Sequence, residues 1–476
     1  MQPVKSLKIK SVTSIVLGPL AYALILAALP AETFTFEMRC AIGTLIWMVC
    51  WWLLPPVDYP VIGLLPIAIN ALFPMIPMSD IISQYASDSV ILVLSGMIIT
   101  ASWESTGLNK RIATAFLNLV GTSVRAQVMF WFLLSTALSA ILPNLVVAAT
   151  ISPIAMSMLK YVGEGDISNS KPGSMIVMSV AWGAGLGGMA TPIGSASNLV
   201  VIEYLEQVSG KEYMYIDWVV RFAPIMLTLL VTCTIYVYLI SPKNVFLAGS
   251  REYLAKVRAD MGKMSRDEAL CFAVFLLAIL LAFTRSLYAE LLPGLAPAYG
   301  FAACAIILFL IPGKTRKRIV SWKKVEAEVD WGLLYMFGGA LSLGKLLTGT
   351  GADVAIGTLI GNTGVSSTMG LVFIIVTFTL AMSDLTSNGA TASMCLPITM
   401  AISSALGTNA TPLLYITAIG INLSFTMPTS IRAIPVGYGL KPSFLAKRGI
   451  VLSAIIIVEM TLLGWALIEF WPAFSL

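Results

Sequence analysis

The sequence predicts an all-α protein that crosses a membrane many times and is built from two repeats of opposite orientation. Three observations support this fold class. Hydrophobic residues make up 58% of the 476 residues and charged residues only 11%, a balance far from that of soluble domains. Apolar runs long enough to span a bilayer recur along the whole chain. Several of these runs are interrupted near their midpoint by polar residues, Pro or Gly.

About eleven membrane-spanning helices and two re-entrant hairpins are expected. A spanning helix needs roughly 20 mainly apolar residues. The hairpins, which enter and leave the membrane on the same side, are expected at 127–160 and 371–406, because each run is broken near its middle. The predicted spans are 12–30, 36–54, 59–75, 88–104, 174–206, 218–240, 269–287, 296–312, 330–347, 412–440 and 450–472.

The N-terminal helix, within residues 1–35, is expected to stay in the protein and to begin in the cytoplasm. Lys5, Lys8 and Lys10 precede an apolar run of span length that has no convincing small-residue cleavage site. With this orientation most Lys and Arg residues fall on cytoplasmic segments, as is typical of a multi-pass inner (plasma) membrane protein. The net charge of +5 follows from this asymmetry and does not indicate nucleic-acid binding. The clearest cytoplasmic cluster comprises Lys314, Arg316, Lys317, Arg318, Lys323 and Lys324.

Two pairs of similar segments indicate internal repetition. The sequence around Gly96 resembles that around Gly338, 242 residues later, and the segment holding Asn144 resembles that holding Asn388, 244 residues later. By the crossing count one hairpin enters from the cytoplasm and the other from outside, so the repeats are inverted. The first repeat is expected at 36–241, with its broken helix at 174–206, and a polar cytoplasmic linker at 242–268. The second repeat is expected at 269–476, with its broken helix at 412–440 and the last helix at 450–472.

The composition excludes several other classes of protein. The six cysteines lie in or beside apolar runs without CxxC pairing, so neither disulfides nor a zinc site are expected. The chain has no histidine, no HExxH motif and no acidic cluster for magnesium, which disfavours a membrane-embedded enzyme. No nucleotide-binding loop is present, which disfavours a primary pump, and paired broken helices suit an occluded midplane site better than a channel. A secondary carrier without a cofactor is therefore predicted.

Four interruptions are candidate binding elements, and each lies between two helical halves. Amides at a half-helix N-terminus point positive partial charge at an anion, while exposed carbonyls and Asn or Ser oxygens suit a sodium ion. Such residues also kink helices and allow close packing, so a purely structural role stays open for each. The four segments are Pro143-Asn144-Leu145, Gly194-Ser195-Ala196-Ser197-Asn198, Ser387-Asn388-Gly389 and Ser430-Ile431-Arg432-Ala433-Ile434.

Over nearly the whole chain these segments resemble the divalent anion/sodium symporters (DASS), which carry di- and tricarboxylates or sulfate. In that family each hairpin tip carries Ser-Asn-Thr, and each following helix is broken at a Thr-Pro-Pro-Asn-like segment. The second tip here keeps Ser387 and Asn388 but has Gly389 in place of Thr, and the first tip keeps only Asn144. The second break departs most from the family, because SIRAI replaces the expected prolines. The first break is similar to the family at Thr191, Pro192, Gly194 and Asn198.

The resemblance implies an inward-facing homodimer in which a transport domain, holding both hairpins and both broken helices, moves like an elevator against a fixed scaffold. It implies a small di- or multivalent anion as substrate, most readily a dicarboxylate, coupled to sodium. A sodium-independent exchanger and a carrier of sulfate or another organic anion stay open as alternatives. The residues expected at the anion are Asn144, Ser195, Ser387, Asn388 and Arg432. The positions that match the family's sodium ligands are Ser139, Asn144 and Gly194 for the first ion and Ser383, Thr386, Asn388 and Ser430 for the second.

Two ionisable residues are expected at membrane depth, where a charge is costly and therefore a functional candidate. Asp384 matches an acidic position of the family hairpin and is expected to brace that hairpin through hydrogen bonds to backbone amides. Arg432 has two open roles. It contacts the anion directly, or it forms an internal salt bridge with Asp384.

Overall fold

The computed structural model describes residues 12–116, 121–313, 318–355 and 367–475 as a bundle of helices. The helices up to the central linker are α1 Val12–Ala28, α2 Phe36–Leu53, α3 Tyr59–Ile62, α4 Leu65–Leu72, α5 Met78–Ile82, η1 Ser83–Ala86, α6 Asp88–Thr106, α7 Leu108–Thr114, α8 Val124–Ser139, α9 Asn144–Tyr161, α10 Lys171–Gly187, α11 Ala196–Ser209 and α12 Tyr215–Ile240. The helices from the linker onward are α13 Ser250–Asp260, α14 Arg266–Phe283, α15 Arg285–Tyr288, α16 Pro297–Leu310, α17 Trp322–Glu328, α18 Trp331–Thr350, α20 Thr368–Leu385, α21 Asn388–Leu406, α22 Ala410–Asn422, η3 Ser430–Arg432, α23 Ala433–Gly437, α24 Pro442–Phe470 and η4 Pro472–Ser475.

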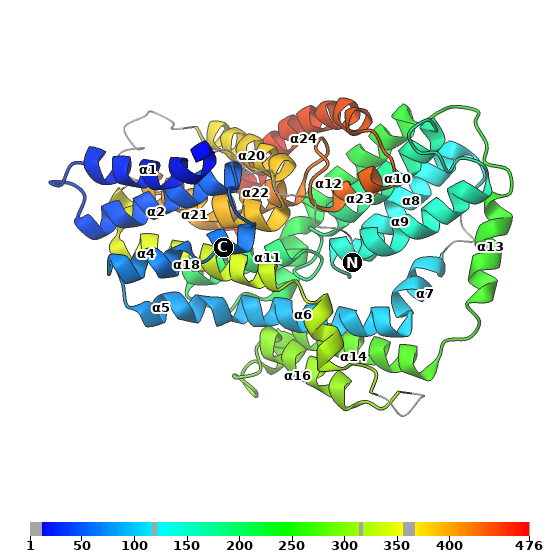
Figure 1. Cartoon of the computed structure of the whole chain (residues 1–476), viewed down its shortest axis with the longest axis horizontal. Coiled ribbons are helices and arrows are strands. Elements are labelled where there is room, and N and C mark those ends of the chain that lie inside the picture. The colour runs from blue at the N-terminus through cyan, green and yellow to red at the C-terminus, as the bar shows by residue number, and fades with distance from the viewer. Residues whose placement is uncertain (1–11, 117–120, 314–317, 356–366, 476) are drawn as a thin grey trace.

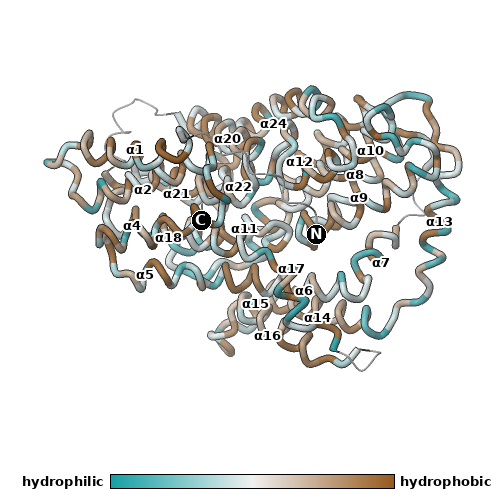
Figure 2. The backbone as a smooth tube through the Cα atoms, in the orientation of Figure 1, coloured by the Kyte–Doolittle hydropathy of each residue, from teal (hydrophilic) through white to brown (hydrophobic). Residues whose placement is uncertain are grey.

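Most of the long helices run roughly along one direction, and α13 runs across one end of the bundle (Figure 1). Within the described residues, six helices are long and apolar enough to cross a membrane: Phe36–Leu53, Met78–Thr106, Asn144–Tyr161, Tyr215–Ile240, Thr368–Leu385 and Pro442–Phe470. Hydrophobic residues follow most of the bundle, whereas α13 is largely hydrophilic (Figure 2). The protein is thus an all-helical bundle with several apolar spans and a polar helix across one end.

Two helical hairpins approach the middle of the bundle from opposite ends (Figure 1). Helices α8 and α9 are joined by residues 140–143 at the first tip, and α20 and α21 are joined by Thr386 and Ser387 at the second tip. Each hairpin is followed in the chain by an interrupted helix. Helix α10 ends at Gly187 and α11 begins at Ala196, and α22 ends before residues 423–429 and the short η3 and α23.

Glycines let each interrupted helix pack closely against its own hairpin. A Cβ atom built at Gly183 would lie 2.2 Å from the carbonyl oxygen of Phe132, and one at Gly187 would lie 2.1 Å from that of Thr136. Helices α10 and α8 therefore touch through backbone, as small residues spaced four apart allow. In the second half, a Cβ at Gly420 of α22 would lie 1.8 Å from the Thr379 hydroxyl oxygen of α20.

The spans read from the sequence differ from the helices in several places. The last helix begins at Pro442 instead of 450, and the stretch that contains α6 begins at Met78 instead of 88. The predicted span 59–75 is divided into α3 and α4 at Gly63, where α18 approaches so closely that a Cβ at Gly339 would lie 2.2 Å from the Gly63 carbonyl oxygen. The predicted span 269–287 corresponds to α14 and the short α15. The linker contains α13, and all six cysteines are free. Part of the predicted cytoplasmic charge lies outside the described residues: Lys5, Lys8, Lys10, Lys314, Arg316 and Lys317.

Candidate functional site

The first hairpin tip is fastened to the first helix break by three hydrogen bonds. The Ser139 hydroxyl donates to the carbonyl of Ala184 at 2.7 Å, and the Thr191 hydroxyl donates to the carbonyl of Ala140 at 2.6 Å. The backbone N–H of Asn144, the first residue of α9, donates to the Gly194 carbonyl at 3.1 Å. Tip and break thus form one hydrogen-bonded unit, which we call the first clamp.

Backbone oxygens gather inside the first clamp. A Cβ atom built at Gly194 would lie 2.6 Å from the carbonyl oxygen of Ser139 and 2.7 Å from that of Gly188, so both oxygens face this glycine. A Cβ at Gly188 would lie 3.2 Å from the Asn144 side-chain nitrogen. A hard cation such as sodium is held by such carbonyl and amide oxygens at an unwound helix. The Ser139 carbonyl and the Asn144 side chain, from two of the residues predicted for the first sodium ion, thus lie close to the Gly188–Gly194 segment.

The second hairpin tip is fastened to the second helix break in a similar way, with a carboxylate added. The Ser383 hydroxyl donates to the carbonyl of Ile421 at 2.8 Å. One oxygen of Asp384 accepts from the backbone N–H groups of Phe425 and Thr426, each at 2.9 Å. The Thr429 hydroxyl donates to the Asp384 carbonyl at 3.0 Å. We call this unit the second clamp. Asp384 was expected to brace the second hairpin through backbone amides. The amides that it binds belong to the second helix break, so Asp384 ties the hairpin to that break.

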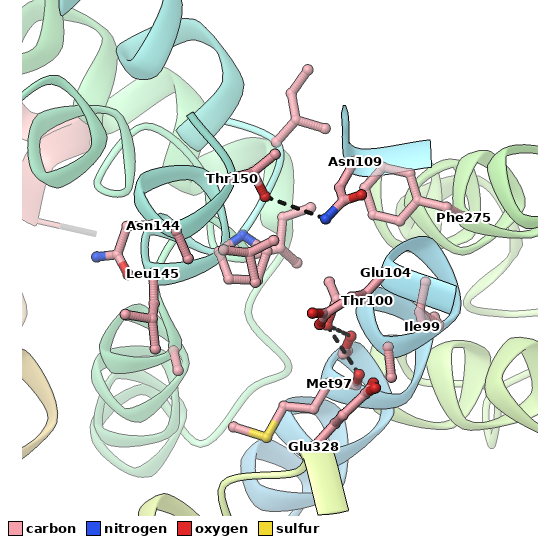
Figure 3. A pocket seen from close by; sticks show the side chains of 18 of the residues that line it. Met97, Ile99, Thr100, Glu104, Asn109, Asn144, Leu145, Thr150, Phe275 and Glu328 are labelled. Atoms are coloured by element: carbon pink, nitrogen blue, oxygen red, sulfur yellow. Dashed lines mark hydrogen bonds between the residues drawn. The ribbon is translucent and has the colours of Figure 1, made fainter. Parts of the chain in front are cut away.

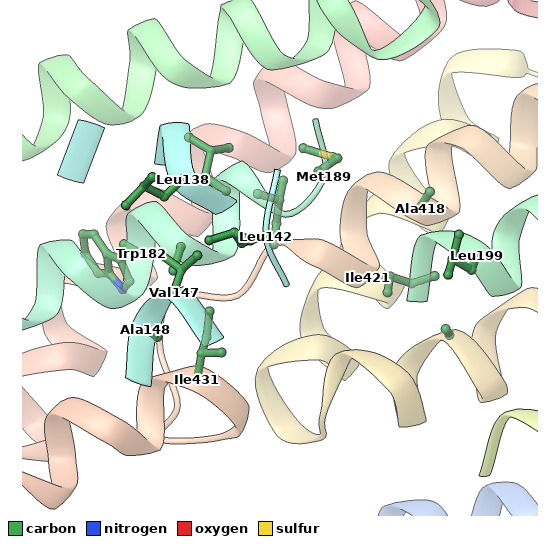
Figure 4. Packing of buried hydrophobic residues seen from close by; sticks show 14 of the residues in the cluster. Leu138, Leu142, Val147, Ala148, Trp182, Met189, Leu199, Ala418, Ile421 and Ile431 are labelled. Atoms are coloured by element: carbon green, nitrogen blue, oxygen red, sulfur yellow. The ribbon is translucent and has the colours of Figure 1, made fainter. Parts of the chain in front are cut away.

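The two clamps meet through side chains of the broken helices. The Asn422 side-chain NH₂ group at the end of α22 donates to the Asn198 side-chain oxygen near the start of α11, at 2.7 Å. Trp182 and Phe425 pack edge to face with ring centroids 5.5 Å apart. Ile431 of η3 packs beside Ala148 of α9 in the buried core (Figure 4). Both clamps are therefore joined into one continuous body at the centre of the bundle.

Asn388 is the most incompletely bonded of the predicted site residues. Its side chain is 7% exposed, and neither its amide nitrogen nor its oxygen has a hydrogen-bond partner in the described parts of the chain. Buried amide groups nearly always have partners, because leaving one unpaired costs about 1–3 kcal/mol per group. The first residue of α21 thus has two buried polar atoms without partners among the described residues.

Arg432 is buried without a carboxylate partner. Its side chain is 1% exposed, Nη2 donates to the Thr429 hydroxyl at 3.2 Å, and Nε has no partner among the described residues. The salt bridge with Asp384, one of its two predicted roles, is not present among the ion pairs of the described residues. The Thr429 hydroxyl links Arg432 to the second hairpin, because it accepts from Arg432 and donates to the Asp384 carbonyl.

The other predicted residues are placed at the same breaks with their own local partners. The Ser195 hydroxyl shares a hydrogen bond with the Ser197 hydroxyl at 2.7 Å, and the Ser387 hydroxyl accepts from the Ala390 N–H as the cap of α21. The Thr386 hydroxyl bonds to that of Thr391 at 2.8 Å. Ser430 is exposed and has a φ of 50°, a left-handed conformation that is uncommon for residues other than glycine.

A cavity of about 840 Å³ extends from the first hairpin tip to α13 and α17. Side chains of α9 face those of α6 across it, and the Asn109 side chain donates to the Thr150 hydroxyl at 3.3 Å (Figure 3). Of the residues predicted at the anion, Asn144 lines this cavity, whereas Ser195, Ser387, Asn388 and Arg432 do not. In this conformation the cavity therefore reaches one side of the predicted site only.

A smaller cavity of about 290 Å³ lies toward the opposite end of α6. Leu92 of α6 and Leu199 of α11 line both cavities and separate them. Beside them the Ser89 hydroxyl bonds to the Leu199 carbonyl at 3.0 Å and to the Glu203 carboxylate at 2.9 Å. A narrow apolar contact between α6 and α11 thus divides the two hollows.

Asn422 and Thr429 are the polar residues that the sequence did not single out. Asn422 lies within an apolar run just before the break. A buried amide at such a position costs free energy unless it has a hydrogen-bond partner. This lone asparagine was the available signal. Thr429 gave none, because threonine is common wherever a helix ends.

Replacing Asp384 with alanine is expected to lower the stability of the folded protein by about 3 kcal/mol, because two buried backbone N–H groups lose their charged acceptor. Asp384→Asn keeps one oxygen acceptor and should cost about half as much. Thermal unfolding of the purified protein measures both changes. The matched control is Asp260→Ala on the exposed end of α13. Equal melting temperatures for Asp384→Ala and Asp260→Ala would contradict the clamp.

The apolar spans, the paired hairpins and the interrupted helices that they hold define a multi-pass membrane transporter rather than an enzyme. The sequence profile of the citrate transporter family (CitMHS) matches residues 44–420. The chain therefore belongs to this family of secondary transporters. The family assignment made from the hairpin and break motifs is confirmed.

Curated relatives cover most of the chain. The sodium-dependent dicarboxylate transporter SdcS of Staphylococcus saprophyticus is 27% identical over 456 residues, 91% of this chain and 87% of that protein. The protein of the same name from Staphylococcus aureus is 26% identical over 442 residues, 89% of this chain and 85% of that protein. The YdaH transporter of Alcanivorax borkumensis has a similar fold, with a TM-score of 0.58 and 13% identity over 86% of this chain and 90% of that chain.

Proposed function

We propose that the protein is a symporter that moves a small di- or multivalent anion, a dicarboxylate first, across the cell inner membrane together with sodium ions. The observation that supports an anionic substrate is the burial of Arg432. A guanidinium that is 1% exposed and has one hydroxyl partner lacks the compensation that a buried charge needs. A carboxylate of the substrate supplies it with two parallel charge-assisted hydrogen bonds.

Asn388 completes the anion site from the second hairpin, with Ser387 beside it. Its NH₂ group donates to the substrate, and its oxygen turns toward a sodium ion, so one side chain serves both ligands. Asn144 and Ser195 contribute from the first clamp. Sodium is held by Ser139, Asn144 and Gly194 in the first clamp and by Ser383, Thr386, Asn388 and Ser430 in the second. The name of the staphylococcal relatives, a sodium-dependent dicarboxylate transporter, agrees with this assignment.

The movement proposed is that of an elevator within a homodimer of two inverted repeats. The first and second clamps move as one body, because the Asn422–Asn198 hydrogen bond joins them. Helices α6 and α18 belong to the fixed scaffold. Among the described residues, few polar bonds join α6, α7 or α18 to the clamps, so sliding breaks little. They run from Ser89 to α11, from Asn109 to α9 and from Tyr204 of α11 to Ala340 of α18. The N-terminus and the end of the bundle that carries α13 face the cytoplasm, which makes the cavity of about 840 Å³ inward-facing.

An anion exchanger without sodium is the second candidate, and Arg432 is also the observation that favours it. A fixed positive charge beside the substrate replaces part of the charge that sodium would neutralise. Uptake of labelled succinate into proteoliposomes separates the two functions. Symport needs sodium outside, while exchange needs an anion inside and is indifferent to sodium. Unlabelled sulfate and citrate as competitors define the class of anion.

Asn388→Ala is expected to weaken sodium and substrate binding together. Coupling between two ligands is reciprocal, so in the wild-type protein each should raise the affinity for the other by the same factor. In the variant this factor should fall toward one. Binding of succinate at graded sodium concentrations, and of sodium at graded succinate, measures it. Asn169→Ala, in an exposed loop, serves as the control. A wild-type succinate affinity that is constant from zero to saturating sodium rejects symport and favours the exchanger.

A further inference from the structure

A separate group of buried oxygens lies where the two broken helices meet. The Asn198 NH₂ group donates to the carbonyls of Gly188 and Thr191, each at 2.8 Å. Only the nitrogen of an amide can donate, so these two bonds fix which way the Asn198 side chain points. Its oxygen must therefore face Asn422.

This orientation determines that of Asn422 in turn. Because the Asn198 oxygen accepts, Asn422 must present its NH₂ group, which donates to that oxygen at 2.7 Å and to the carbonyl of Ala418 at 3.0 Å. The Oδ1 atom of Asn422 then points away from both. Asn422 is 1% exposed, and this oxygen has no donor within the described residues. A flipped amide would not relieve it, since the Asn198 oxygen would lose its donor.

Ser424 adds a second unpaired oxygen next to the first. It is 4% exposed, and its hydroxyl also lacks a partner in the described chain. Leu423 between the two residues is extended, with φ of −100° and ψ of 119°. Side chains on either side of an extended residue leave the chain toward the same face. Asn422 and Ser424 thus place two buried, unpaired oxygens two residues apart at the end of α22.

Negative groups lie close to these two oxygens, while Asn198 stands in the first turn of α11, where the helix dipole is positive. Asn422 is the last residue of α22, where the helix dipole is negative and the terminal carbonyls lack helical partners. The last turn of α10 approaches the same place, because a Cβ atom at Gly185 would lie 3.9 Å from the Asn422 carbonyl oxygen. Asp384 binds the two amides that directly follow Ser424 and adds a negative charge nearby. Carbonyls at half-helix C-termini are known ligands for sodium in transporters.

We propose that Oδ1 of Asn422 and Oγ of Ser424 hold a sodium ion at the junction of the two broken helices, with Asn198 as the positioning residue. This site is additional to the two sodium sites in the clamps, and it rests on the proposed coupling to sodium. An ion here strengthens the junction of the two clamps, which the Asn422–Asn198 hydrogen bond already joins.

Sodium-dependent stability of the purified full-length protein tests this site without any anion. The melting temperature is followed as NaCl replaces KCl at constant total salt, because an ion that binds only the folded state raises stability with its concentration. Ser424→Ala should raise the half-maximal sodium concentration about fivefold, and Asn422→Leu about tenfold or more. Asn422→Asp should lower it, since a carboxylate is the stronger ligand. Asn388→Ala reports separately on the second clamp.

The variants distinguish an ion from a structural amide. An Asn422 that only bridges to Asn198 would be damaged by aspartate, which cannot donate, with no change in the sodium midpoint. Ser424→Ala leaves the Asn422–Asn198 hydrogen bond intact. The sodium midpoint of this variant therefore tests the site even if Asn422→Leu does not fold. If Ser424→Ala and Asn422→Asp both keep the wild-type sodium midpoint, the proposed site is wrong. Bound water is then the partner of the two oxygens. If Asn388→Ala alone shifts the midpoint, sodium coupling stands without this site. If the melting temperature of the wild-type protein does not change with sodium concentration, both this site and the proposed sodium coupling are rejected.

Discussion

Arg432→Ala is expected to abolish anion binding and transport. Two charge-assisted hydrogen bonds to a substrate carboxylate contribute about 1.5–3 kcal/mol each, so their loss raises the substrate Kd by at least about a hundredfold. Arg432→Lys keeps the positive charge but loses the planar fork, and it should show an intermediate affinity in a folded protein. Succinate-induced thermal stabilisation gives the affinity, and proteoliposome uptake gives the transport rate.

The alternative role of Arg432 is to brace the second hairpin through Thr429, and it gives a different pattern. In that case Thr429→Val, which removes the shared hydroxyl, should lower stability about as much as Arg432→Ala, and both variants should bind succinate with normal affinity. Arg432→Ala combined with Asp384→Ala tests the charge interaction further. The two residues share Thr429 as a hydrogen-bond partner, so their effects on stability should depart from additivity. Normal binding by Arg432→Ala would remove this residue from the anion site.

Among substitutions that add one methyl group to the first clamp, Gly187→Ala is expected to lower the stability of the protein most. The new Cβ would lie 2.1 Å from the Thr136 carbonyl oxygen and 2.9 Å from the Cβ of Ser139, so α8 and α10 must separate. Overpacking of this kind against backbone costs about 3 kcal/mol. Separation also breaks the hydrogen bond from Ser139 to Ala184, which holds the hairpin tip in place. Monodisperse yield and melting temperature should both fall sharply.

Gly96→Ala is the matched control, because Gly96 also lies inside a long helix. No atom lies within 4 Å of a Cβ built at this position, so the substitution should be neutral or slightly stabilising through helix propensity. A Gly187→Ala protein as stable as Gly96→Ala would show that α8 and α10 do not touch through backbone.

The sequence predicted the hairpins and breaks because backbone interruptions leave a clear signal in an apolar chain. Pro143 and Asn144 mark the first tip, Ser387 and Asn388 mark the second, and the helices end within a few residues of these positions. The division at Gly63 also has a local signal that was not used, because Pro66 stands in the first turn of α4 and cannot continue α3. The close contact of Gly63 with Gly339, nearly 280 residues away in the chain, leaves no such pattern.

Hydrogen-bond partners were harder to predict than positions. Asp384 was expected to bind backbone amides and does so, but the amides belong to Phe425 and Thr426 of the break, which only the packing of α20 on α22 makes adjacent. The same packing directs one Asp384 oxygen to these amides, and no ion pair with Arg432 is present among the described residues. The Asn198–Asn422 contact depends on two interrupted helices meeting end to side, and neither helix's own sequence specifies that encounter.

The position of Leu92 and Leu199 between the two cavities bears on whether ions can leak through the protein. A carrier driven by an ion gradient must never let ions run freely down that gradient, and the point of greatest danger is where two water-accessible hollows come closest. Here that point is closed by two aliphatic side chains shared by both hollows. Hydrophobic constrictions exclude water and therefore the hydrated ions that travel with it. Under the proposed coupling to sodium, the leucine pair would keep ions from passing directly from one hollow to the other.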